Sequence, residues 1–108
     1  MAKYLCQASY TPEGMCGLIK DKASGRKAAV QAAIRAAGGK LESFYYAFGK
    51  DDVVIIVDMP DNATAAGFLT AVAASGMVRI RTTPLLTIEE MDKGLASKAK
   101  YRAPGAAN

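Results

Sequence analysis

The chain has 108 residues, which is the size of one domain and enough to bury a core without a metal or disulfide staple. It contains no histidine, which excludes imidazole metal sites and both Ser-His-Asp and Cys-His catalysis. The net charge of +4 comes from residues 93–108, which hold four basic residues and no acidic one. Residues 1–92 therefore carry no net charge. Because domains that bind duplex nucleic acid cluster positive charge on the folded surface, we expect no nucleic-acid partner.

The two cysteines, Cys6 and Cys16, form no Cys-x-x-Cys motif and are too few for a disulfide framework. We therefore expect no metal and no cofactor. The N-terminal residues lack the apolar core of a signal peptide, and the longest run of large apolar residues, 53–57, is far too short for a membrane span. We expect a cytoplasmic protein with no membrane partner.

Alternating apolar residues predict a first strand over residues 3–10. Thr11-Pro12-Glu13 then supplies the N-cap, the N1 proline and the first-turn acid of a helix. This helix is expected to break near residues 22–25 and to resume over residues 26–37. Gly38-Gly39 stops it, because glycine adopts a left-handed backbone without steric cost.

Residues 40–48 alternate as a second strand, with one face expected to carry Leu41, Ser43, Tyr45 and Ala47. The β-branched run over residues 53–59 predicts a central strand covered on both faces. Asp61 is expected to cap a helix that ends before Gly76, and residues 77–83 form a fourth strand.

Thr87-Ile88-Glu89-Glu90 has the pattern of a capping box and predicts a C-terminal helix. Beyond it the chain is small, basic and without large apolar anchors. We expect one domain over residues 1–98 and a flexible basic tail over residues 99–108.

This order predicts an α+β protein with a ferredoxin-like β-α-β-β-α-β plait followed by a C-terminal helix. Right-handed crossovers place both helical segments on one face of a four-stranded antiparallel sheet. The other face then carries Val54 and Ile56, which are too apolar to leave in water. We therefore expect a second copy of the chain to cover that face, in a homodimer or a larger homo-oligomer.

Strand parity places Asp58, Arg79 and Arg81 on the sheet face away from the helices. We expect Asp58 to approach an arginine across the first strand, near Gln7 or Ser9. Two guanidiniums beside one carboxylate can hold a small anion. The same residues can instead form a polar ring in an interface between copies, which is the interpretation that the sequence favours, because buried charge is tolerated mainly when it is paired.

Aromatic residues gather in the second strand and at the ends of the first: Phe44, Tyr45, Tyr46 and Phe48, with Tyr4 and Tyr10. They can line a cavity between sheet and helices, where a tyrosine hydroxyl donates to a ligand or to a developing oxyanion. Aromatics at alternating strand positions are more often simply core.

Four stretches in order along the chain resemble the GYD-domain family, within the dimeric α+β barrel group: residues 4–14, 38–49, 52–56 and 82–87. The resemblance implies a ferredoxin-like protomer that pairs sheet to sheet, and it implies no particular reaction. Related barrel enzymes use the sheet-helix cavity for aromatic or polyketide-like substrates. The Gly-Tyr-Asp signature of the family reads Gly49-Lys50-Asp51-Asp52 here, so Asp51 stands where an aromatic residue is expected.

Two functions stay open. The favoured one is a self-associating ligand-binding or assembly module, because the sequence shows no histidine, no clear nucleophile–base pair and no metal-ligand set. The alternative is a cofactor-independent enzyme, of oxygenase or isomerase type, acting on a small organic substrate in the sheet-helix cavity. The candidate ligand-binding residues are Arg79, Arg81, Asp58, Tyr10 and Tyr46, and no residue is assigned a catalytic role.

Overall fold

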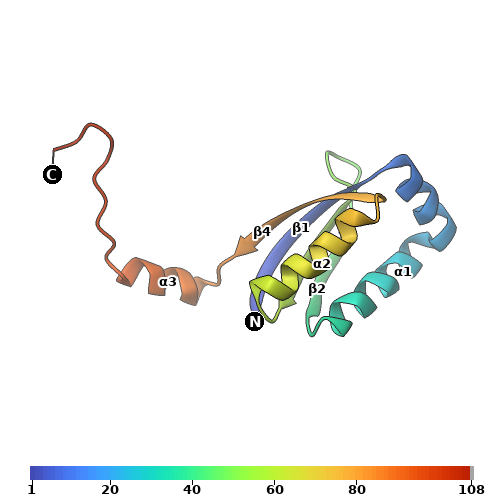
Figure 1. The fold of residues 1–108 in the computed structure, drawn as a ribbon, viewed down its shortest axis with the longest axis horizontal. Coiled ribbons are helices and arrows are strands. Elements are labelled where there is room, and N and C mark those ends of the chain that lie inside the picture. Colours follow the sequence, from blue (N-terminus) through green and yellow to red (C-terminus); the bar gives the residue numbers. More distant parts are fainter. Residues whose placement is uncertain (108) are drawn as a thin grey trace.

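The computed structural model describes residues 1–107. In chain order its elements are β1 (Ala2–Tyr10), α1 (Pro12–Ala36), β2 (Lys40–Tyr46), β3 (Val53–Met59), α2 (Asn62–Ala74), β4 (Val78–Leu85) and α3 (Ile88–Ala96). Helices α1 and α2 lie on one face of the sheet, while α3 lies beyond its end (Figure 1). The predicted α+β fold, a ferredoxin-like plait with a C-terminal helix, is confirmed.

The four strands lie in the order β2-β3-β1-β4, and each neighbouring pair is antiparallel. This order makes β1 and β3 the central strands and leaves β4 at one edge. Strand β4 continues through Pro84 and ends at Leu85, two residues beyond its predicted end at residue 83. The edge position explains this, because a proline at a sheet edge can face solvent and then removes no hydrogen bond from the ladder.

The core lies between the helices and one face of the sheet. Alternate residues of the two central strands are buried there together with Ile34 of α1 and Ala65 of α2; the strand residues are Tyr4, Cys6, Ala8, Val53, Ile55, Val57 and Met59. The opposite sides of the same strands, such as Leu5, Val54 and Ile56, are only partly buried. In a single chain, therefore, β3 is covered on one face and not on both.

Helix α1 is kinked at Lys22, which confirms the expected break. Lys22 has φ 66° and ψ 163°, a backbone conformation that only glycine adopts without strain. The helix resumes directly after this residue, earlier than the predicted second start at Arg26, so one strained residue separates the two segments.

The expected alternation along the second strand is wrong, because β2 contains a bulge. Leu41 lies opposite Val57 and Ser43 lies opposite Ile56, so Glu42 is an extra residue in the ladder. The bulge brings Leu41 onto the helix-covered face, which Phe44 and Tyr46 also share. Tyr45 points the other way and is 70% exposed.

The strand also ends at Tyr46, short of the predicted end at residue 48. Phe48 lies in the following turn and is fully exposed.

Helix α3 and residues 97–107 extend away from the rest of the chain (Figure 1). The radius of gyration is 17.5 Å, whereas a compact chain of this length has about 13 Å. The capping box predicted for α3 is present, with Thr87 and Glu90 bonded to each other's backbone N–H groups. The division into a domain over 1–98 and a tail over 99–108 stays a prediction, and Asn108 lies outside the described residues.

Among residues 1–107, no helix combines the length and the apolar character that crossing a membrane requires.

Candidate functional site

A cleft opens between α1 and α2. Its volume is about 480 Å³, within the range of small-molecule sites. We call it the α1–α2 cleft; its walls are Tyr10, Glu13, Gly14, Gly17, Asp21, Arg26, Ala33, Phe68, Ala71, Val72, Ser75, Met77 and Val78. Apolar atoms form most of this lining, and charged groups come from Glu13, Asp21 and Arg26 only.

A smaller space of about 90 Å³ lies deeper, between the helices and the sheet. It shares five lining residues with the α1–α2 cleft, namely Tyr10, Arg26, Phe68, Val72 and Val78. Its remaining walls are strand and helix residues: Ala8, Val30, Phe44, Val53, Ile55 and Ile80. Because these five side chains border both spaces, the two spaces are direct neighbours.

Small residues on the facing helices leave the cleft open. Helix α1 packs on β1 and β2, helix α2 packs on β3 and β4, and the two helices make little contact with each other. A Cβ added at Gly17 would meet no atom within 4 Å, so this wall of the cleft borders empty space. Alanines 33 and 71 likewise present only a methyl group to the cleft.

The charged groups at the mouth of the cleft are weakly engaged. Arg26 Nη1 lies 3.5 Å from Asp21 Oδ2, a long distance for an ion pair, and both side chains are partly exposed. Arg26 is therefore held near the cleft but keeps donors free for another partner.

One tyrosine, Tyr10, lines the cleft, and a second, Tyr46, lies next to the lining residues Tyr10 and Phe44 without lining either space. Tyr10 lines both spaces, and its backbone N–H donates to Asp52 Oδ2 at 2.8 Å, which fixes the end of β1 against the β2–β3 turn. The Tyr46 hydroxyl donates to the carbonyl oxygen of Ala23, directly after the kink in α1, at 3.3 Å. Its ring lies 5.2 Å from that of Phe44, between centroids.

The pKa of Tyr46 is raised to about 12. The largest cause is burial of the hydroxyl, the second is the neighbouring Tyr10, and Arg26 lowers the pKa by a smaller amount. The hydroxyl therefore remains protonated at neutral pH. Its single proton is donated to the Ala23 carbonyl, and the hydroxyl is a poor base.

The other aromatic residues expected around this cavity do not line it. Tyr45 is on the opposite face of the sheet and Phe48 is in the solvent. Tyr4 is buried in the core, where its hydroxyl donates to the side-chain oxygen of Asn62.

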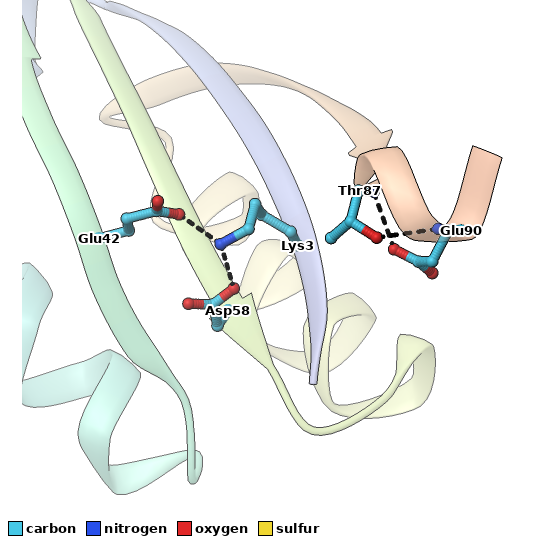
Figure 2. A network of polar contacts seen from close by, with 5 residues as sticks. All are labelled: Lys3, Glu42, Asp58, Thr87 and Glu90. Atoms are coloured by element: carbon cyan, nitrogen blue, oxygen red, sulfur yellow. Dashed lines mark hydrogen bonds and ion pairs between the residues drawn. The ribbon is translucent and has the colours of Figure 1, made fainter. Parts of the chain in front are cut away.

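The expected approach of Asp58 to an arginine is wrong. Asp58 lies opposite Lys3 on β1, whereas Arg81 lies opposite Gln7, four residues further along the same strand and so about 13 Å away. Figure 2 shows Lys3 between two carboxylates: its Nζ is 2.8 Å from Asp58 Oδ1 and 2.5 Å from Glu42 Oε2. The pKa of Lys3 is raised, mainly by its hydrogen bond to Asp58 and next by its hydrogen bond to Glu42.

The two arginines have different surroundings. Arg81 Nη2 donates to Asp51 Oδ2 at 2.7 Å, so its carboxylate partner comes from the β2–β3 turn. Within residues 1–107, Arg79 forms no ion pair, and it is exposed on the same sheet face. A site in which Asp58 orients both guanidiniums is therefore not formed in the single chain.

The pattern of elements and the sequence agree on the family. A family model described as "GYD domain" matches residues 4–95, from β1 to α3. The chain belongs to the GYD domain family. No curated protein matches the sequence.

In this GYD domain, the Asp51 side chain is mostly buried against Arg81. The ion pair between them has a local role, since it ties the β2–β3 turn to the edge strand β4.

Sequence reasoning missed Arg26, Phe68 and Gly17 as cleft residues. A lone arginine on a helix is typical of a solvated surface, and a phenylalanine on a helix that packs on a sheet is typical of ordinary core packing. Gly17 did carry a signal, because glycine inside a helix costs about 1 kcal/mol relative to alanine and so suggests a local requirement. Among residues 1–107, no three histidine, cysteine, aspartate or glutamate side chains gather in a way that could hold a metal ion.

Proposed function

We propose that this GYD domain binds a small, neutral organic molecule in the α1–α2 cleft. The observation that carries the proposal is the 480 Å³ cleft, which shares five lining residues with the inner space beside Phe44 and Val53. Apolar walls favour a ligand with an apolar body, whereas Arg26 and the Tyr10 hydroxyl favour one carbonyl or hydroxyl group on it.

Neutrality follows from the charges at the mouth. Glu13 and Asp21 oppose a single Arg26, so the mouth carries a net negative charge and repels an anion. Tyr46, next to Tyr10, adds no charge, because its raised pKa keeps the hydroxyl protonated. Donors from Tyr10 and Arg26 among apolar walls suit a phenol or an aromatic ketone.

Binding is favoured over catalysis because the chain contains no histidine that could act as a general base in the cleft. A general base works best with a pKa near the operating pH, and that of Tyr46 is moved away from it. The alternative is a cofactor-independent oxygenase or isomerase. Such an enzyme would need a protonated tyrosine to donate a hydrogen bond to a developing oxyanion.

The experiment is an NMR titration of ¹⁵N-labelled protein with acetophenone as the probe. Gly17→Leu fills the cleft, and Gly67→Leu is the matched control, because Gly67 is an exposed helical glycine whose added Cβ also meets no atom within 4 Å. We expect saturable shifts around Gly17 and Val72, with an affinity of about 1 mM, retained in Gly67→Leu and lost in Gly17→Leu. Equal binding by both variants, or shifts outside the cleft, would overturn the proposal.

We also propose that the domain works as a homo-oligomer, a dimer or larger. The partly exposed apolar side chains on the uncovered sheet face, chiefly Val54 and Ile56, support this. Light scattering at micromolar concentration tests it: we expect at least a dimer, which Ile56→Glu weakens and Thr70→Glu, on the exposed side of α2, leaves unchanged. A stable monomer of the unmodified protein would refute self-association.

The proposed location is the cytoplasm. Both cysteines are free thiols, one buried and one exposed, which is compatible with a reducing compartment.

A further inference from the structure

The helix α3 presents an apolar stripe that its own chain leaves uncovered. The stripe consists of Ile88, Met91 and Leu95, spaced i, i+3 and i+7, and these side chains are 81%, 48% and 66% exposed. Leu86, just before the helix, is also exposed. We call residues 86–96 the α3 arm.

A helix of this length is marginal in water. α3 has nine residues, whereas isolated helices shorter than about 12 residues rarely persist without tertiary packing. The capping box at Thr87 and Glu90 satisfies backbone groups at its start, but most helix stability in proteins comes from burying the apolar stripe. The arm therefore needs a surface to pack against.

A complementary surface exists on the same molecule. The sheet face away from α1 and α2, the outer sheet face, has an apolar centre of partly buried side chains: Leu5, Val54, Ile56 and Leu85. Two exposed arginines, Arg79 and Arg81, stand on β4 beside that centre. Arg81 is paired with Asp51, and Arg79 has no ion pair within residues 1–107.

The charges on the arm match this face. On a helical projection Asp92 and Glu89 lie along one flank of the apolar stripe, while Lys93 lies on the opposite side of the helix. With the stripe on the apolar centre, the acidic flank comes next to the arginines of β4. Oppositely charged flanks beside apolar centres are the anatomy of a specific interface.

The arm of a chain points away from its own outer sheet face. β4 ends at Leu85, opposite Lys3 at the start of β1, and α3 continues outward past this end of the sheet (Figure 1). The molecule is 60 Å long but only 31 and 22 Å across. A second copy offers the same face to the outstretched arm, and reciprocal exchange satisfies both chains at once.

We propose that two copies exchange their α3 arms, each arm packing its Ile88, Met91 and Leu95 stripe on the outer sheet face of the other, with Asp92 and Glu89 next to Arg79. This rests on the proposed self-association and is independent of ligand binding in the α1–α2 cleft. Four apolar side chains per arm bury about 300 Å² of apolar surface, and with the surface beneath them two arms bury about 1,200 Å², which reaches the lower bound of a stable interface.

The first test compares two variants of the full chain by analytical ultracentrifugation. Met91→Gln removes a stripe residue, and Lys93→Gln is the matched control on the opposite side of the same helix. We expect the dimer dissociation constant to rise at least tenfold for Met91→Gln and to stay within threefold for Lys93→Gln. Arg79→Glu is expected to weaken the dimer similarly, and Asp92→Lys in the same chain to restore it. Equal effects of both glutamine variants would overturn the exchange.

The second test locates the arm directly. A nitroxide is attached at Ala96→Cys in a Cys16→Ser background, and these chains are mixed with ¹⁵N-labelled unmodified chains. We expect amide broadening at Gln7, Arg79 and Arg81 of the labelled copy. A dimer without this broadening overturns the exchange but keeps self-association, and arms folded back on their own sheets give that result too. A monomer at all concentrations overturns both.

Discussion

The substitution Gly14→Ala tests how the first turn of α1 is held against the α2–β4 connection. A Cβ at Gly14 would lie 1.9 Å from the carbonyl oxygen of Met77 and 2.8 Å from its carbonyl carbon. These are backbone atoms, so no side-chain rotation relieves the clash. The Met77 carbonyl must retreat by about 1 Å, or the start of α1 must move away from the sheet.

The loss in the free energy of unfolding can be worked out from the hydrogen bonds that the Met77 carbonyl accepts. It accepts hydrogen bonds from the Thr11 backbone N–H at 2.9 Å and from Thr11 Oγ1 at 3.2 Å. Losing both costs about 2 kcal/mol, and the overpacking costs about 2 kcal/mol more. Alanine returns about 1 kcal/mol through its better helix propensity. The net loss is about 3 kcal/mol, which lowers the melting temperature by about 12 °C in a domain of this size.

Urea denaturation followed by circular dichroism measures the difference, with Gly17→Ala as the control. Gly17 lies in the same helix, and its added Cβ meets no atom within 4 Å, so the control is expected to gain about 0.5–1 kcal/mol. The two variants should therefore move the midpoint in opposite directions. A Gly14→Ala protein within about 1 kcal/mol of the unmodified one would refute this account of the contact.

Three further predictions concern single features of the chain. Lys22→Gly should raise the free energy of unfolding by about 1 kcal/mol in the same denaturation assay, because relief of the strained backbone exceeds the added glycine entropy; a loss would contradict the strain. The Glu90 carboxyl accepts from the Thr87 backbone N–H, which lowers its pKa. Its contribution to α3 is thus fully present above the ordinary glutamate pKa and lost as pH falls through the lowered value, so the Thr87 amide shift should titrate there in NMR and not in Glu90→Gln. Removing residues 99–108 should change the melting temperature by less than about 2 °C, since the described part of this segment is exposed; a larger drop would show that it is docked.

Local signals in the sequence predicted the elements well. The N-caps at Thr11, Asp61 and Thr87 are all confirmed, because capping needs only a side chain and the two or three residues after it. The β-branched run of β3 likewise identified a central strand. Each of these features is decided within a few residues of sequence, so no knowledge of the partner strand was required.

Features that depend on how two strands pair could not be predicted in the same way. The bulge at Glu42 reversed the parity of the start of β2, and nothing in a single alternating strand shows where its neighbour skips a residue. The pairing of Asp58 failed for a related reason. Parity placed Asp58 and the arginines on the correct face, but their separation along β1 depends on the register of two strand pairs.

The candidate site was predictable only in part. Tyr10 was found because aromatic residues in strands stand out, and it lines the cavity, whereas Tyr46 lies beside Tyr10 and lines neither space. Arg26 was not found, because its place in the cleft depends on the kink one turn earlier in α1. Whether these residues bind a ligand stays a prediction.

The kink also connects Tyr46 to Arg26 at the mouth of the cleft, which gives a last prediction. Tyr46 on β2 donates to the Ala23 carbonyl directly after Lys22, and Arg26 follows one turn later. Tyr46→Phe removes this link but keeps the ring beside Phe44. We expect the absorbance titration at 295 nm to lose one tyrosine of pKa about 12, and the affinity for acetophenone to fall about threefold as the second segment of α1 becomes less fixed. Tyr45→Phe is the control, because Tyr45 is exposed on the other face of the sheet. If Tyr46→Phe lost the titration and bound the probe as before, the kink would not control the cleft.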